Sequence, residues 1–232
     1  MNRIDRGFWP TLVLLAAVLA LFEFTALDLA VQDRLYDFST QQWRVDGKAP
    51  GPRFWFYHTP KVAIIALGVA VLGLADGPAR WRRGLDRRAL FVAFLTLGTV
   101  PALIGWGKSI SNTFCPSEIR RYGGDAPYVK VCSPYPEDDR PARRGRCFPA
   151  GHASGGFALV GLIGLARTTR GRWIALALAL GVGGAMGGYQ MAKGAHYLSH
   201  TVVTMLLAWW MFLLWRRVLG TRGREGVRSP GR

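Results

Sequence analysis

Three of the chain's four histidines lie in two short segments. His152 ends the segment Phe-Pro-Ala-Gly-His at 148–152, and His196 and His200 lie in Gly-Ala-His-Tyr-Leu-Ser-His at 194–200. Each segment stands at the start of a long apolar run. Residues four apart share one face of a helix, so His196 and His200 are expected to act together. Because histidine changes charge near neutral pH, the pattern predicts a catalytic or metal site.

Two kinds of chemistry use such a set. A zinc site with three histidines is possible, but no Asp or Glu lies within several residues of either segment to orient the ligands. Phosphoryl transfer through a phosphohistidine fits better. One imidazole attacks phosphorus, a second protonates the leaving oxygen, and cations and helix N-terminal N–H groups bind the phosphate. Gly151 permits a close approach of the backbone. No metal or other cofactor is expected.

Apolar residues gather in six runs, which predict an all-α polytopic membrane protein with six transmembrane helices. The runs cover 8–30, 62–75, 89–106, 152–166, 173–188 and 198–215. Glu23 lies towards the end of the first run, where an interfacial and a functional role both stay open. We expect residues 1–215 to form one membrane domain. The arginine-rich tail, 216–232, is expected to be disordered and cytoplasmic.

The net charge of +16 is distributed unevenly. Arginines cluster at 80–88, at 167–172 and in the tail, between or after apolar runs. The positive-inside rule places these clusters, and both chain termini, in the cytoplasm. The 108–151 loop and both histidine segments then face the other side, the periplasm of a bacterial inner membrane. A nucleic-acid partner is not expected, because the chain carries no nucleic-acid motif.

The histidine segments and the loop resemble the type-two phosphatidic acid phosphatase superfamily, a group of integral-membrane lipid phosphatases with three motifs. The first motif is Lys, six residues, then Arg-Pro, and here Lys108 precedes Cys115 and Pro116 at that spacing. The second motif is Pro-Ser-Gly-His, and here Ala150 replaces the serine before Gly151 and His152.

The third motif of that superfamily is Arg, five residues, His, three residues, Asp. Here the same spacing holds Gln190, His196 and His200. The resemblance implies that His196 is the nucleophile, that His152 is the general acid, and that Lys108 binds phosphate oxygens together with Ala150 and Gly151. His200 can orient His196 by accepting its proton. It cannot offer the negative charge of the aspartate that it replaces, so a slower enzyme or a shifted pH profile is expected.

The two missing motif arginines need replacements. Lys193 stands one helical turn beyond the position of the third-motif arginine, and Arg146 and Arg121 are within reach in the loop. The loop also holds three cysteines without a CxxC spacing, which argues against zinc. A disulfide between Cys115 and Cys147 would tie the first two motifs together and stabilise the fold by about 3 kcal/mol. Cys132 remains an alternative partner.

These observations predict a membrane phosphatase that hydrolyses a lipid phosphate or pyrophosphate through a phosphohistidine. Isoprenyl pyrophosphates, lipid A phosphates and phospholipid phosphates all fit the expected site. A lipid phosphotransferase and a non-catalytic protein that binds phosphorylated lipids are the alternatives. The expected partners are a phosphorylated membrane lipid and the bilayer, and the oligomeric state stays open.

Overall fold

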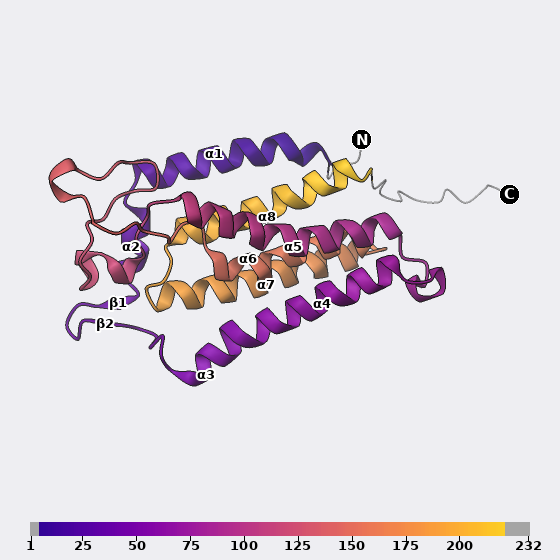
Figure 1. Ribbon diagram of the computed structural model, residues 1–232, viewed down its shortest axis with the longest axis horizontal. Coiled ribbons are helices and arrows are strands. Elements are labelled where there is room, and N and C mark those ends of the chain that lie inside the picture. Colours follow the sequence, from indigo (N-terminus) through magenta and orange to yellow (C-terminus); the bar gives the residue numbers. More distant parts are fainter. Residues whose placement is uncertain (1–4, 221–232) are drawn as a thin grey trace.

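The computed structural model describes residues 5–220, which are 70% helical, so the all-α prediction is confirmed. Figure 1 shows an elongated bundle of long helices with irregular segments gathered at one end. A strand pair, β1 and β2, and several short 3-10 turns complete the fold. The elements are α1 (Phe8–Phe24), α2 (Leu27–Asp33), β1 (Tyr36–Asp37), β2 (Gln42–Trp43), α3 (Pro50–Arg53), α4 (Thr59–Asp76), α5 (Arg87–Ile110), α6 (Gly151–Ala158), α7 (Thr169–Ala192) and α8 (Leu198–Val218).

The predicted number of membrane spans is not reached. Within residues 5–220, four helical stretches are long and apolar enough to cross a membrane: Pro50–Asp76, Arg87–Ile110, Thr169–Ala192 and Leu198–Val218. A fifth is obtained if α1 and α2, which meet at a bend of 68°, form one broken span. The bend follows from Thr25, whose extended backbone ends α1 while its hydroxyl donates to the Leu21 carbonyl.

The predicted run 152–166 corresponds to a shorter apolar helix, Gly151–Leu165. It begins as α6 and continues as a tighter 3-10 segment, Leu159–Leu165. At the other end of the sequence, α8 continues to Val218, so the first residues of the predicted tail are helical. The rest of that tail, 221–232, lies outside the described residues.

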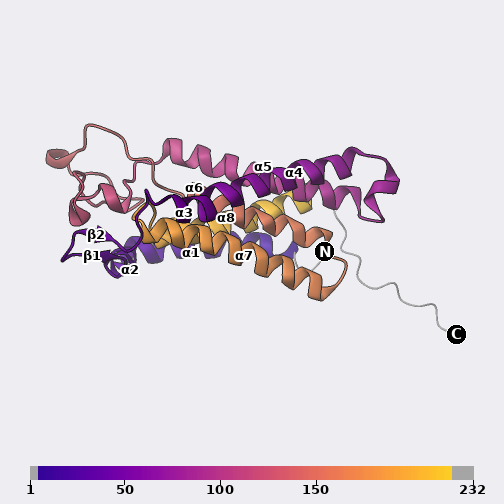
Figure 2. The ribbon, with the colours of Figure 1, turned by 90° about the horizontal axis from the view of Figure 1, so that it is seen from below.

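The basic turns and the histidine segments lie at opposite ends of the bundle. In Figures 1 and 2 the α4–α5 turn, the start of α1 and the end of α8 lie together at one end. The loop between α5 and α6, the β1–β2 pair and α2 lie at the other end. The arginine clusters at 80–88 and 167–172 are therefore separated from the histidines by the length of the helices, whereas the arginines of the α5–α6 loop lie at the histidine end.

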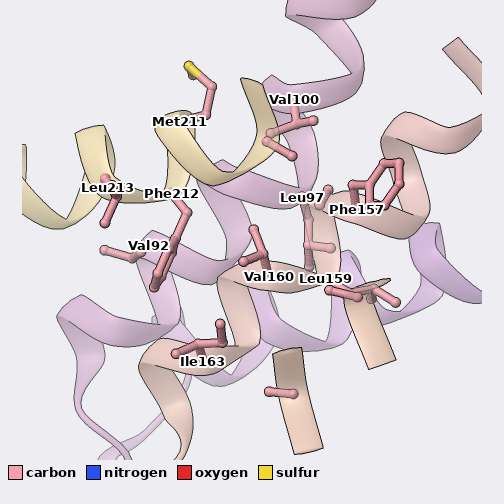
Figure 3. Packing of buried hydrophobic residues seen from close by; sticks show 14 of the residues in the cluster. Val92, Leu97, Val100, Phe157, Leu159, Val160, Ile163, Met211, Phe212 and Leu213 are labelled. Atoms are coloured by element: carbon pink, nitrogen blue, oxygen red, sulfur yellow. The ribbon is translucent and has the colours of Figure 1, made fainter. Parts of the chain in front are cut away.

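The core lies between α5, α6 with its 3-10 continuation, and α8. Figure 3 shows side chains of these elements packed together, among them Val92, Phe157, Val160 and Phe212. In α6, Gly156 also packs directly against Gly183 of α7, where an added Cβ would come within 2.6 Å of the glycine backbone. This close contact holds the short α6 against a long helix.

The α5–α6 loop is ordered by polar contacts with the N-terminal region. Glu23 accepts hydrogen bonds from Ser133 Oγ at 2.6 Å and from the Cys132 N–H at 3.1 Å. For Glu23, the sequence left an interfacial and a functional role open. In the structure, its carboxylate anchors the α5–α6 loop. Cys115 and Cys147 are joined by a disulfide, which links the two ends of the loop, and Cys132 is a free, exposed thiol.

Aromatic residues join the strand pair to the loop and to the second histidine segment. The rings of Tyr36, Trp43 and Tyr122 lie with centroids about 5 Å apart: 4.9, 5.2 and 5.0 Å for the three pairs. Trp43 also packs against Gly194, where a Cβ would overlap the indole ring. Gly194 has φ of +74°, a conformation that glycine adopts at little cost.

Candidate active site

The three predicted histidines come together at the loop end of the bundle. His152 lies in the first turn of α6, His196 lies in the connection between α7 and α8, and His200 lies in the first turn of α8. The ring centroids of His152 and His196 are 5.9 Å apart, and those of His196 and His200 are 5.7 Å apart. His196 and His200 are each only 1% exposed.

Hydrogen bonds to α8 fix the N-terminus of α6. The Ala150 N–H donates to Thr204 Oγ1 at 2.9 Å, and the Thr204 hydroxyl in turn donates to the His200 carbonyl at 2.8 Å. Ala150 therefore has no free N–H for a substrate, but it sets the position of Gly151 and His152. A Cβ on Gly151 would lie 3.4 Å from Lys108 Nζ. The lysine thus lies against the helix N-terminus, where an anion is favoured.

Two side chains of α2 hold the second histidine segment. Gln32, which is fully buried, donates from Nε2 to the His196 carbonyl at 3.0 Å. Asp28 caps α8, because its carboxylate accepts from the Ser199 N–H at 2.8 Å and from Ser199 Oγ at 2.5 Å. Neither α2 residue was predicted to belong to the site. The only signal in the sequence was a carboxylate, Asp28, near the end of the first apolar run and an amide, Gln32, just after it.

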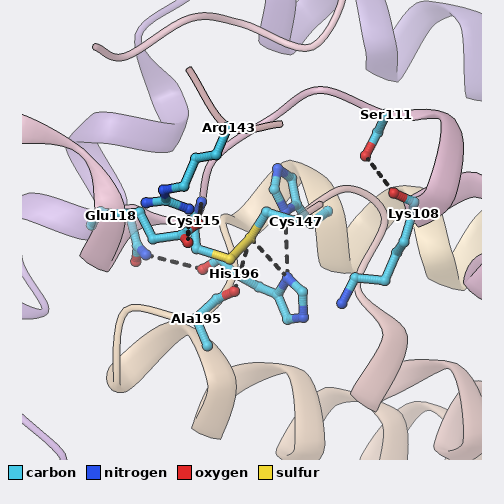
Figure 4. Close-up of a disulfide and its surroundings, with 10 residues drawn as sticks. Lys108, Ser111, Cys115, Glu118, Arg143, Cys147, Ala195 and His196 are labelled. Carbon is cyan, nitrogen blue, oxygen red and sulfur yellow. Dashed lines mark hydrogen bonds and ion pairs between the residues drawn. A yellow bond between two sulfur atoms is a disulfide. The ribbon is translucent and has the colours of Figure 1, made fainter. Parts of the chain in front are cut away.

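The two ring nitrogens of His196 have different neighbours. Its Nδ1 lies 3.5 Å from His200 Nδ1 and 3.5 Å from the sulfur of Cys147. Figure 4 shows Lys108 extending towards the other side of the His196 ring. Burial, reinforced by the charges of His200 and Lys108, holds the pKa of His196 well below its ordinary value. The imidazole is therefore neutral at neutral pH, which is the form that can attack phosphorus.

Three lysines lie near enough to His152 for their charges to act on it: Lys108, Lys193 and Lys61. Lys193 follows α7, and its Nζ lies 5.0 Å from the Tyr189 ring. Burial lowers the pKa of Lys193. Lys61 belongs to α4 and was not among the predicted site residues, so its place beside His152 is a finding of the tertiary structure.

The loop arginines differ in their contacts. Arg121 forms two hydrogen bonds to the Asp33 carboxylate, at 2.8 and 2.7 Å, and this partner raises the pKa of Arg121. Its charge is thus already paired. Arg146 is exposed directly before Cys147. The position of the missing third-motif arginine holds Gln190, which is fully buried and whose amide atoms have no hydrogen-bond partner among residues 5–220.

The three histidines do not form a metal-binding group in this structure. Among the described residues, the one group with suitably close ligand atoms consists of Cys147, His196 and His200, whose atoms lie within 4.8 Å of one another. His152 is not part of it. The Cys147 sulfur is bonded to Cys115, so it could serve as a thiolate ligand only after reduction of the disulfide.

An apolar cavity of about 590 Å³ leads away from His152 between α4, α5 and α6. Lys61, Gly151 and His152 lie at its end near the loop. Apolar side chains line it farther along the bundle, including Ile64, Val69, Phe94 and Leu97. A polar site thus opens into an apolar groove of the size that holds small-molecule ligands.

Comparison with known proteins assigns the family. No curated protein and no solved structure matches the chain. A family model described as PAP2 superfamily matches residues 89–224, more than half of the chain. The matched region contains Lys108, His152, His196 and His200, whereas α1 to α4 precede it. The chain therefore belongs to the PAP2 superfamily, whose members are typically phosphatases that act on phosphate esters.

Proposed function

We propose that the protein hydrolyses a phosphorylated membrane lipid, a lipid phosphate or pyrophosphate, through a phosphohistidine formed on His196. The observation that carries this proposal is the placement of a buried, neutral His196 beside His152 and Lys108, at the end of an apolar groove. The distribution of arginines supports an active site on the periplasmic side of a bacterial inner membrane.

In the first step His196 Nε2 attacks phosphorus while the bond from phosphorus to the lipid oxygen breaks. His200 holds the ring from the Nδ1 side, where the two Nδ1 atoms are 3.5 Å apart, so Nε2 is the free nucleophile. Protonated His152 donates its proton to the leaving oxygen. The negative phosphate favours this protonated form, which burial and the charges of the three neighbouring lysines disfavour in its absence.

In the second step water attacks the phosphorus of the phosphohistidine. His152, now neutral, accepts a proton from that water, and the P–N bond breaks to return neutral His196 and free phosphate. Each proton that His152 gives in the first step is thus recovered in the second. Nothing in this cycle requires a metal ion.

The phosphate oxygens need positive partners, and lysines supply them in our proposal. Lys108 and the N–H groups at the start of α6 bind one side of the phosphate, and Lys193 and Lys61 approach from other elements. Arg146 stays a candidate because it is exposed near the site. Arg121 would have to leave Asp33 in order to take part.

The lipid chain fits the groove. Its apolar walls would hold hydrocarbon, and Lys61 and His152 would meet the headgroup at the loop end. Isoprenyl pyrophosphates, lipid A phosphates and phospholipid phosphates all meet these requirements. Transfer of the phosphate from His196 to a lipid hydroxyl, instead of to water, is the second candidate, because the groove would also admit such an acceptor.

Phosphate release from farnesyl pyrophosphate and from phosphatidic acid, by protein purified in detergent, tests the proposal. We expect release with and without EDTA, and an acid-labile phosphoryl group on the protein when the reaction is quenched. His196→Ala should reduce release by at least about 10³-fold and abolish the labelling. His58→Ala, a change at the one histidine outside the site, should retain both.

Three results would overturn parts of this proposal. Loss of activity with EDTA would indicate a reaction that depends on a metal ion. Transfer of phosphate to an added lipid alcohol in preference to water would establish a phosphotransferase. Retained lipid binding without any release would identify a lipid-binding protein.

A further inference from the structure

His200 occupies the position of the aspartate in the third motif of the superfamily. One of its ring nitrogens faces His196, and the other has no hydrogen-bond partner among residues 5–220. Its Nδ1 faces His196 Nδ1 at 3.5 Å. If His196 donates a proton in this contact, His200 must accept at Nδ1, and a neutral imidazole then carries its own proton on Nε2. This tautomer requires an acceptor for the His200 Nε2–H.

Within residues 5–220, His200 Nε2 is buried and has no hydrogen-bond partner. His200 lines a small cavity of about 10 Å³ that also borders Asp28, Tyr197 and Ser199. This volume corresponds to roughly one water molecule. The Tyr197 hydroxyl is likewise buried without a partner. The cavity is thus water-sized, although apolar side chains form most of its wall. Glu23 also borders it, but its oxygens accept hydrogen bonds from Ser133 and Cys132. The cavity is shared by His200 and the carboxylate of Asp28.

That carboxylate belongs to α2 and is firmly placed. Asp28 is 6% exposed, and both of its oxygens accept hydrogen bonds from Ser199, the residue before His200. Each carboxylate oxygen can accept more than one hydrogen bond. Capping α8 therefore leaves Asp28 able to accept a further bond from the cavity.

We propose that Asp28 is a positioning residue that supplies, through a water in this cavity, the negative charge that His200 cannot supply. The His196 Nδ1–H donates to His200 Nδ1, the His200 Nε2–H donates to the water, and the water donates to Asp28. No proton leaves its nitrogen. As His196 becomes positively charged on forming the P–N bond, the aligned dipoles and the Asp28 charge stabilise it. The inference rests on the proposed phosphohistidine function.

A double-mutant cycle tests this role. We expect Asp28→Asn to lower kcat for farnesyl pyrophosphate by about tenfold while KM changes less than about twofold, because the Asp28 charge stabilises the positive charge that develops on His196 only in the transition state. In a His200→Asp background, where a carboxylate meets His196 directly, Asp28→Asn should cost less than about threefold. Ser199→Ala is the matched control, because it removes one bond to Asp28 but keeps the charge, and kcat should fall less than twofold.

Two results would show that Asp28 acts only as a helix cap. One is an equal loss of kcat from Asp28→Asn in both backgrounds, and the other is a loss in Ser199→Ala as large as that in Asp28→Asn. A second readout needs no turnover: ¹⁵N NMR of the histidine imidazoles. We expect His200 to be protonated on Nε2, with a shift of that nitrogen in Asp28→Asn and none in Ser199→Ala. A His200 protonated on Nδ1 would refute the inference even in an active enzyme. The expected shifts in a protein without phosphatase activity would instead refute the proposed function alone.

Discussion

The region from α5 to α8 and the region from α1 to α4 contribute to the site in different ways. In the most apolar windows of α5, α7 and α8, 44%, 44% and 56% of residues are buried, against 11% in the stretch Pro50–Asp76 that contains α4. The first region forms the packed core and carries the histidines and Lys108. The second region adds the polar contacts of two α2 side chains, Gln32 and Asp28, and one wall of the groove from α4.

This difference shows how helices that precede the region matched by the family model can add contacts and a groove wall to its site. The contacts of α2 are polar and buried: Gln32 holds the His196 carbonyl and Asp28 caps α8. The surface of α4 is apolar and largely exposed, as suits a helix that faces lipid. We therefore expect changes in the core region to cost stability, and changes at the groove-lining residues of α4 to affect mainly substrate binding.

The largest expected effect in this comparison comes from the disulfide. Replacing Cys115 and Cys147 by alanine releases a cross-link between residues 32 apart, which is worth about 3 to 4 kcal/mol of unfolding free energy. The thermal unfolding temperature in detergent without reductant should fall accordingly. Cys132→Ala, a change at the free exposed thiol, is the control and should leave that temperature unchanged. A pair variant as stable as the wild type would show that packing alone holds the loop.

A smaller loss is expected at the contact between α6 and α7. In Gly183→Ala the new Cβ would overlap the Phe157 ring, so overpacking should cost about 1 to 3 kcal/mol. Gly184→Ala is the matched control, because no atom lies within 4 Å of a Cβ there. Denaturation midpoints of the two variants would compare them directly. Equal midpoints would mean that α6 and α7 can move apart at little cost. The core region would then be as loosely packed as α4.

The smallest effect is expected at Lys61 in α4. Lys61→Ala should raise KM for farnesyl pyrophosphate about threefold to fivefold, with unfolding temperature unchanged, because it removes a partially solvated charge contact to the headgroup. Lys48→Ala, in an exposed turn outside the groove, should not change KM. A loss of unfolding stability in Lys61→Ala comparable to that of the disulfide variant would break the distinction between the two regions.

Much of the candidate site follows from local sequence. Gly151 before His152 marks the start of a helix, and the second histidine segment precedes another helix. The spacing from His196 to His200 predicted one helical face, but His196 lies in the connection before α8 begins at Leu198. Apolar runs were enough to predict helices, but not the number of spans, because the bend after Thr25 and the 3-10 continuation of α6 are short-range features inside apolar sequence. Predicted disorder in the tail beyond residue 220 is not addressed by the described residues.

What the sequence alone determined is the family core: helical segments, the histidines that meet at one end, and their separation from the arginine clusters at 80–88 and 167–172. These follow from periodicity, hydrophobicity and motif spacing, which act over a few residues. Only the tertiary structure decided that Gln32 and Asp28 hold the histidine segment, across separations of 164 and 171 residues, and that Lys61 joins the site while Arg121 pairs with Asp33. Such contacts depend on which helices pack together, and no local pattern encodes that choice.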